Sequence, residues 1–440
     1  MRVLLIIFDG LADRPAPELD GKTPLEAART PNLDRLAAEG INGLFHPKSP
    51  GYPLGSPLAL HLMFGYPEDR FPDRGPLLAS ARGLDIAEGE VVLAARFASI
   101  EPEPDGRLRL IQRFVRGREE ECRALADAIA THEIDGLSFR YVYAGRGDGN
   151  LFISGGASFE VTDTDPLGLD LPVLKAQPRA GVGDAASATR SAEALNEYLV
   201  WAHSQLNAHA TRGDEPPINF LITKWAGPKP DYELFAQRWG MRAASLPDEE
   251  VVSGLMLELG FRVEQIDDAD PESDLRRRLA RARELLAEGY EFIHLHSKYP
   301  DPMSHDNDPP RVRDAIEALD AGMETYWREM APDPDLITVL TTDHTTPSVW
   351  TDHPRGRFSD LHSGEEVPIA VRGGNVRVDG VTAFGERAAG GGDLGHLRGD
   401  DFMPVLLNAA ERANMWEMRP TPSRRLHRPR PNEIEPFRLE

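Results

Sequence analysis

The stretch Val3-Leu4-Leu5-Ile6-Ile7-Phe8-Asp9-Gly10 decides the fold class, because six consecutive apolar residues lead directly into a carboxylate. A continuous apolar run of this length is typical of a strand buried on both faces of a parallel sheet. Similar runs follow at 291–296 and 336–340, and helical patterns at 274–288 and 312–330 lie beside them. Strands that alternate with helices predict an α/β domain whose mostly parallel sheet is sandwiched by helices.

The middle of the chain has a different pattern from its two ends. Between 73 and 230, short β-like runs occur with fewer long helices, and one helix is expected at about 187–209. We therefore expect residues 73–230 to form an inserted α+β domain that splits the α/β domain into 1–72 and 231–412. Residues 413–440 contain Arg-Pro-Thr-Pro and Arg-Pro-Arg-Pro and are expected to form an extended tail.

The composition disfavours several classes of protein. With 49 Lys and Arg against 72 Asp and Glu, the 440-residue chain has a formal charge of −23, so we expect no binding to nucleic acid or anionic lipid. The one cysteine, Cys122, cannot form an intrachain disulfide, and the opening apolar run is too short for a signal peptide or membrane helix. We expect a cytoplasmic protein that acts on a small molecule; its oligomeric state is not indicated.

Acidic and imidazole side chains follow the predicted strands closely. In open α/β sheets, ligands bind outside the carboxyl ends of the strands, so side chains that follow neighbouring strands are expected to meet there. A further histidine lies in a loop before another apolar run. Taken singly, each candidate also fits a helix cap, a turn or an exposed loop, but their convergence on one sheet edge favours a ligand site. The candidates are Asp9, Asp301, His305, Asp343, His344 and His362.

Ser56 ends the loop Gly51-Tyr52-Pro53-Leu54-Gly55-Ser56 and opens a helical apolar stretch at 58–64. The dipole at a helix N-terminus favours an alkoxide and a bound phosphate. Carboxylates and imidazoles without thiolates suit Mn²⁺ or Zn²⁺, and there are enough of them for two divalent ions. Two ions about 3.5–4 Å apart stabilise the entering and leaving oxygens of a phosphoryl displacement. These residues therefore predict metal-dependent phosphoryl transfer with an activated serine.

Several further motifs occur in a fixed order along the chain. They are Asp9-Gly10-Leu11-Ala12-Asp13-Arg14, Lys22-Thr23-Pro24-Leu25-Glu26-Ala27-Ala28, Thr30-Pro31-Asn32-Leu33-Asp34, Gly55-Ser56, Gly65-Tyr66, Arg74-Gly75-Pro76, Val161-Thr162-Asp163-Thr164-Asp165-Pro166, Asp343-His344, His362-Ser363-Gly364 and Leu394-Gly395-His396. Nearly end to end, the chain resembles the alkaline phosphatase superfamily and, within it, the archaeal-type 2,3-bisphosphoglycerate-independent phosphoglycerate mutases. The resemblance implies an alkaline-phosphatase-like core with an inserted cap domain.

The resemblance also implies roles for individual residues. One metal ion would be held by Asp301, His305 and His362, and the other by Asp9, Asp343, His344 and the Ser56 oxygen. Ser56 would be the nucleophile that becomes phosphoserine, and Lys298 would be a catalytic lysine just before the first metal aspartate. Lys224 stands where the family usually has a substrate-facing arginine, and Arg140 matches a family arginine, so both would bind the substrate.

Three positions depart from the family pattern. Pro57 and Leu60 stand where an Asp and a His usually follow the serine, and Leu167 stands where a His usually follows Asp-Thr-Asp-Pro. His61 is one position along, and a shift of one residue on a helix turns a side chain by about 100°. The phosphoryl-transfer residues are therefore complete, whereas polar groups expected around the glycerate are changed.

Three functions remain open at this point. The first is a phosphoglycerate mutase of glycolysis that interconverts 2- and 3-phosphoglycerate through a phosphoserine intermediate. The alternative is a metal-dependent phosphohydrolase or phosphotransferase that acts on another small phosphate or phosphonate ester. The third, a non-catalytic binding or assembly module, is disfavoured because buried carboxylates without metal ions would carry a desolvation and repulsion cost.

Overall fold

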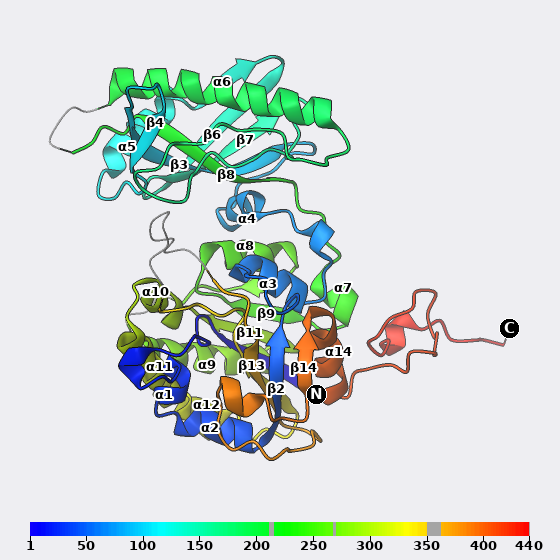
Figure 1. Ribbon diagram of the computed structural model, residues 1–440. Coiled ribbons are helices and arrows are strands. Elements are labelled where there is room, and N and C mark those ends of the chain that lie inside the picture. The colour runs from blue at the N-terminus through cyan, green and yellow to red at the C-terminus, as the bar shows by residue number, and fades with distance from the viewer. Residues whose placement is uncertain (211–214, 267–269, 350–361, 440) are drawn as a thin grey trace. The chain divides into compact units, whose positions relative to one another are not determined.

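The computed structural model describes residues 1–439 except 211–214, 267–269 and 350–361 (Figure 1). The chain forms two compact units. The first contains Met1–Phe71 and most of the chain from Tyr232 onwards, and the second contains Pro72–Asp231. Among the described helices, none combines the length and the apolar character that crossing a bilayer requires.

The first unit is built on an eight-stranded mixed sheet. Its strands, in spatial order, are β10 (Arg262–Val263), β9 (Ala243–Leu246), β11 (Phe292–Ser297), β1 (Arg2–Phe8), β12 (Leu336–Thr341), β13 (Val367–Arg372), β2 (Gly40–His46) and β14 (Gly395–Arg398). Strand β1 pairs in parallel with β11 on one side and β12 on the other. Only β13, among the described strands of this sheet, runs antiparallel to its neighbours. The predicted α/β class with a mostly parallel sheet is confirmed.

Helices supply the apolar surface that buries this sheet. They are α1 (Pro24–Ala27), α2 (Pro31–Ala38), α3 (Ser56–Met63), α7 (Phe235–Trp239), α8 (Glu250–Glu258), α9 (Pro271–Ala287), α10 (Pro300–His305), α11 (Pro309–Gly322), α12 (Glu324–Glu329), α13 (Glu386–Ala389) and α14 (Gly399–Ala409). Leu4, Ile6 and Ile293 of the sheet share one core with Leu279 of α9 and Ile316 of α11. Because side chains alternate along a strand, the residues between them face the opposite layer. There Phe292 packs against Phe235 of α7.

A buried arginine fixes the chain that leaves β9. Arg278 of α9 is 1% exposed and forms an ion pair with Asp274 one turn earlier. Its Nη1 also donates to the carbonyl oxygens of Leu246 and Pro247, at 3.0 and 3.2 Å. Buried guanidinium groups need such partners, since an unpaired buried charge is costly. The arginine therefore holds the segment that leads from β9 to Glu249.

The second unit contains a six-stranded antiparallel sheet. Its strands are β3 (Val91–Pro102), β4 (Leu108–Gln112), β5 (Thr131–Ile134), β6 (Leu137–Gly145), β7 (Asp148–Ser154) and β8 (Phe220–Pro228). Helices α5 (Glu119–Ala128) and α6 (Ala185–His209) pack on one face, and α4 (Arg74–Ala81) lies against the other (Figure 1). The long helix expected at about 187–209 is α6.

Candidate metal centre

Three neighbouring parallel strands carry carboxylates to one edge of the first unit's sheet. Asp9 directly follows β1, Asp343 follows β12, and Asp301 lies in the first turn of α10, shortly after β11. The backbone N–H of Asp301 donates to the carbonyl oxygen of Asp9 at 3.1 Å. Gly10 permits this approach, because it has a φ of +75° and a Cβ there would lie 2.5 Å from the Asp301 backbone. The three carboxylates are therefore held together by both strand order and a glycine contact.

Asp301 is surrounded by two imidazoles. His305 is one turn further along α10, and its Nε2 lies 3.3 Å from Asp301 Oδ1. His362 Nε2 lies 3.6 Å from the same oxygen. His362 Nδ1 donates to the Leu54 carbonyl at 2.6 Å, which directs Nε2 towards the carboxylate. Two imidazole nitrogens therefore lie close to one oxygen of Asp301, as the implied ligand set requires. Compared by mutual distance, the ligand atoms group Asp301 with His362 and His344 rather than with His305.

The second set of implied ligands surrounds Ser56, the first residue of α3. Its Oγ lies 3.3 Å from Asp9 Oδ2 and 3.1 Å from His344 Nε2. The same His344 nitrogen is 3.2 Å from Asp9 Oδ1 and 3.5 Å from Asp343 Oδ2. His344 Nδ1 lies 3.1 Å from the Thr346 hydroxyl, which fixes the ring. The serine hydroxyl is therefore in contact with Asp9, His344 and Asp343, the other residues implied for its ion.

The buried carboxylates carry an electrostatic cost. Asp9 and Asp343 are both inaccessible to solvent. Burial, with the neighbouring Asp301 and Asp343 charges, raises the pKa of Asp9 well above its usual range. Burial raises the pKa of Asp343 to about 6. Within the described chain, Asp9 Oδ1 and Asp343 Oδ2 accept no hydrogen bond. Divalent cations would satisfy both the charge and the orphaned oxygens, so these oxygen and nitrogen donors fit a metal centre.

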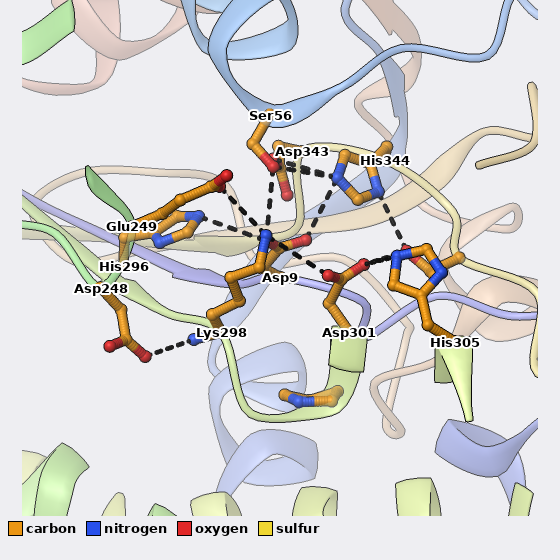
Figure 2. A network of polar contacts seen from close by, with 12 residues as sticks. Asp9, Ser56, Asp248, Glu249, His296, Lys298, Asp301, His305, Asp343 and His344 are labelled. Atoms are coloured by element: carbon orange, nitrogen blue, oxygen red, sulfur yellow. Dashed lines mark hydrogen bonds and ion pairs between the residues drawn. The ribbon is translucent and has the colours of Figure 1, made fainter. Parts of the chain in front are cut away.

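Lys298 lies among these carboxylates. Figure 2 shows its ammonium group facing Asp9, Glu249 and Asp301. The Nζ is 3.4 Å from Asp9 Oδ2, 3.4 Å from Asp301 Oδ2 and 3.0 Å from Glu249 Oε2. Burial alone lowers a lysine pKa, but these carboxylates raise the pKa of Lys298 well above its usual range. The neighbouring carboxylates therefore favour the charged form of Lys298.

The sequence matches the Metalloenzyme superfamily over residues 1–409. It is 33% identical over 448 residues to 2,3-bisphosphoglycerate-independent phosphoglycerate mutase 2 of Methanocaldococcus jannaschii, covering 99% of each chain. It is 34% identical to the 2,3-bisphosphoglycerate-independent phosphoglycerate mutase of Thermococcus kodakarensis, covering 94% of this chain and 98% of the relative. The chain belongs to this family of phosphoglycerate mutases. The match to the Metalloenzyme superfamily and the clusters of carboxylates and imidazoles that could hold an ion together support the use of divalent metal.

Two solved structures resemble this mutase-family chain along most of its length. One is the PH0037 protein from Pyrococcus horikoshii, with a TM-score of 0.75 and 29% identity, covering 95% of this chain and 99% of the other. The second is the cofactor-independent phosphoglycerate mutase from Thermoplasma acidophilum, with a TM-score of 0.61 and 28% identity, covering 93% and 99%. The family resemblance read from the motifs is thereby confirmed.

The two expected substrate-binding residues of this mutase-family chain lie in its second unit. Lys224 of β8 is buried, with its Nζ 3.5 Å from Asp165 Oδ2 and 3.7 Å from the Trp225 ring centroid. Burial lowers the pKa of Lys224 to about 8. Arg140 of β6 is more exposed; it stacks on a phenyl ring and lies 3.6 Å from Glu90. Lys224 is thus part of a buried charged group, whereas Arg140 is at the surface.

Three other polar residues were not predicted. Arg113 forms charge-assisted hydrogen bonds with both carboxylate oxygens of Asp165, one of them 2.9 Å long, beside Lys224. Glu249 pairs with Lys298. His296 forms a possible ligand group with Asp9 and Asp343. Arg113 and Glu249 are far from their partners along the chain, so only the fold identifies these contacts. His296 could have been considered from the sequence, because it is two residues before Lys298.

The structure places no polar side chain at the positions that depart from the mutase-family pattern. Pro57 and Leu60 are buried in α3. His61 is buried too, with Nδ1 3.0 Å from the Tyr232 hydroxyl and Nε2 2.8 Å from the Pro67 carbonyl, so both nitrogens are used in packing. Leu167 follows the Asp165 motif with a φ of 63° and is 41% exposed. His61 therefore does not replace the polar group lost at position 60.

Proposed function

We propose that the chain is a cofactor-independent phosphoglycerate mutase that interconverts 2- and 3-phosphoglycerate through a phosphoserine at Ser56. The observation that carries this proposal is the contact of the Ser56 hydroxyl with Asp9 and His344 beside two more buried carboxylates, in a member of this family. A hydroxyl at the first turn of a helix and next to metal ligands is set up to attack phosphorus. A role in glycolysis and a cytoplasmic location remain predictions from the sequence.

Two divalent ions, Mn²⁺ or Zn²⁺, fit the donor set. We assign Asp301, His305 and His362 to one ion, and Asp9, Ser56, Asp343 and His344 to the other. When bound, such ions lower the pKa of the serine hydroxyl and stabilise negative charge on the phosphoryl oxygens. The identity and the number of the ions are part of the proposal.

The reaction needs two phosphoryl transfers through one serine. Ser56 Oγ forms a bond to phosphorus while the bond from phosphorus to the substrate oxygen breaks. The bound glycerate then turns, its other hydroxyl oxygen attacks the phosphoserine, and Ser56 Oγ leaves. Lys298 would place its positive charge near the phosphoryl oxygens, because its ammonium shares Asp9 Oδ2 with the Ser56 hydroxyl. We propose that the second unit acts as the cap that excludes water, since water would turn transfer into hydrolysis.

Hydrolysis of another small phosphate or phosphonate ester is the second candidate. The apolar side chains of Pro57, Leu60 and Leu167 favour it, because polar groups that would recognise a glycerate are missing from these positions. Both reactions use the same ligands and the same serine, so the metal centre alone does not separate them.

The two functions separate in one assay. We expect Mn²⁺-loaded protein incubated with 3-phosphoglycerate to form 2-phosphoglycerate without release of inorganic phosphate, with both products followed over time. Release of phosphate without the isomer would contradict the mutase and support the hydrolase. Formation of neither product would show that phosphoglycerate is not the substrate.

Lys224 and Arg140 are proposed to bind the substrate, and Lys224→Met tests the more buried of the two. We expect KM for 3-phosphoglycerate to rise about tenfold or more, because a charge-assisted hydrogen bond contributes about 1.5–3 kcal/mol. Asp165 keeps its bonds with Arg113 in this variant, so the second unit should still fold. Lys175→Met, at an exposed position of the same unit, is the matched control. An unchanged KM would exclude Lys224 from binding.

A further inference from the structure

His296 lies near the carboxyl end of β11 and faces Asp9. Parallel pairing sets Ile7 of β1 opposite His296, so the imidazole is next to the residues that follow β1. Its Nε2 is 3.8 Å from Asp9 Oδ2. One possible ligand atom from each of Asp9, His296 and Asp343 lies within 4.8 Å of the other two. Figure 2 shows the ring beside Glu249 and Lys298, at the edge of the carboxylate cluster.

The side chain of His296 is inaccessible to solvent. Within the described part of the chain, neither of its ring nitrogens has a hydrogen-bond partner. At 3.8 Å, the contact with Asp9 is too long to be a hydrogen bond. An unsatisfied buried polar group costs about 1–3 kcal/mol, so such groups in native proteins generally have a partner of some kind. The position of Nε2 next to two carboxylates indicates a cation as that partner.

His294 provides an internal comparison. It lies two residues earlier on β11, so it faces the same side of the sheet, and it is equally buried. However, His294 Nδ1 is 2.8 Å from the Ser245 hydroxyl, and its ring packs edge-on against Phe64. Among the described residues His294 Nε2 also has no hydrogen-bond partner, but its Nδ1 is bonded and no carboxylate is paired with it, whereas both nitrogens of His296 are unsatisfied and its Nε2 lies 3.8 Å from Asp9.

We propose that His296 is a further ligand of the ion held by Asp9 and Asp343. The inference rests on the two-ion centre of the proposed function and adds a nitrogen donor to it. With Ser56 and His344, this donor gives one ion five ligands from the protein. Imidazole nitrogen suits Zn²⁺, Co²⁺ and Mn²⁺ better than Mg²⁺, which prefers oxygen ligands and retains its water. His296 therefore adds a second imidazole to that of His344 and strengthens the preference for a transition metal at the ion that contacts the nucleophile.

Titration with Co²⁺ tests this proposal without an activity measurement. We expect His296→Leu to weaken the binding of one of the two Co²⁺ ions by about tenfold or more and to change its visible absorption, which reports the ligand number. His294→Leu is the matched control, because it makes the same change on the same face of the same strand. We expect it to keep both ions and the wild-type spectrum.

A crystal structure of the Co²⁺-loaded wild-type protein provides a second measurement that needs no variant to fold. We expect an anomalous peak about 2.0–2.2 Å from His296 Nε2. Two bound ions with no peak within about 3 Å of that nitrogen would overturn the role of His296 but leave the two-ion centre standing. Unchanged Co²⁺ affinities and an unchanged spectrum in His296→Leu would do the same. Fewer than two ions in the wild-type protein would overturn the two-ion centre itself.

Discussion

Replacing Ser56 with alanine is expected to abolish mutase activity and the phosphoenzyme together. The loss of turnover should be at least about 10³-fold, because removing the nucleophile of a covalent mechanism leaves only binding and electrostatic contributions. The variant should fold, since Gly55 rather than Ser56 is the N-cap residue of α3. Most of the metal should remain, because the proposed ligands other than the Ser56 oxygen are carboxylate and imidazole groups that this change leaves in place.

Labelled 3-phosphoglycerate measures the intermediate directly. After acid quenching, the wild-type protein should carry acid-stable phosphoserine label and Ser56→Ala should carry none. Ser253→Ala is the matched control. The Ser253 hydroxyl donates to the Glu249 carbonyl oxygen at 2.9 Å, and it contacts none of the proposed metal ligands. Label that persists in Ser56→Ala would exclude Ser56 as the nucleophile, whatever the effect on turnover.

The central strands could be predicted from sequence because a strand that is buried on both faces of a sheet requires apolar residues at every position. The run Val3–Phe8 lies between two parallel neighbours and is completely buried, so every position is apolar. The edge strand Gly395–Arg398 has no such run, because its exposed positions tolerate polar residues. The antiparallel direction of Val367–Arg372 depends on pairing with both neighbours, which an apolar pattern does not encode.

One helix boundary was missed for a related reason. The pattern over 312–330 predicts one helix, but the structure has α11 ending at Gly322 and α12 beginning at Glu324. Met323, between them, is fully buried in the same core as Leu319. Hydrophobic periodicity therefore continues through the break between the two helices, and the pattern alone does not reveal it.

The candidate ligands could be listed from sequence because they follow strands, but their neighbours could not be assigned. His344 illustrates this, because its Nε2 faces Asp9 while its ring stacks on His362 at 3.6 Å. His296 lies within an apolar run, where a histidine usually belongs to the core. Only the pairing of β11 with β1 places it against Asp9. The register of two strands separated by almost 300 residues is a property of the fold.

Replacing Asp343 with asparagine is expected to remove metal and activity together. An amide oxygen has no charge to offer a divalent ion, so metal content should fall and turnover should fall by at least about 100-fold. Metal analysis after dialysis and the isomerisation assay measure the two effects. Asp306→Asn is the matched control, because that aspartate is exposed and its contact is an ion pair with Arg311. Wild-type metal content and turnover in Asp343→Asn would remove Asp343 from the centre.

The same variant should be more stable than the wild-type protein when both are stripped of metal. Burial raises the pKa of Asp343 to about 6 from a usual value of 3.8, so the folded protein binds this proton more tightly than the unfolded chain does. Stability from this group is therefore present at low pH and is lost as pH rises from about 4 to about 6. At pH 8 the charged carboxylate costs up to about 3 kcal/mol, which the neutral amide avoids. Denaturant unfolding at pH 8 in a chelator should show the stabilisation, and the difference should shrink at pH 4. If metal-free Asp343→Asn were less stable than the metal-free wild-type protein at pH 8, the charged Asp343 carboxylate would not destabilise the fold. That result would contradict the view that these carboxylates repel one another unless a cation is bound.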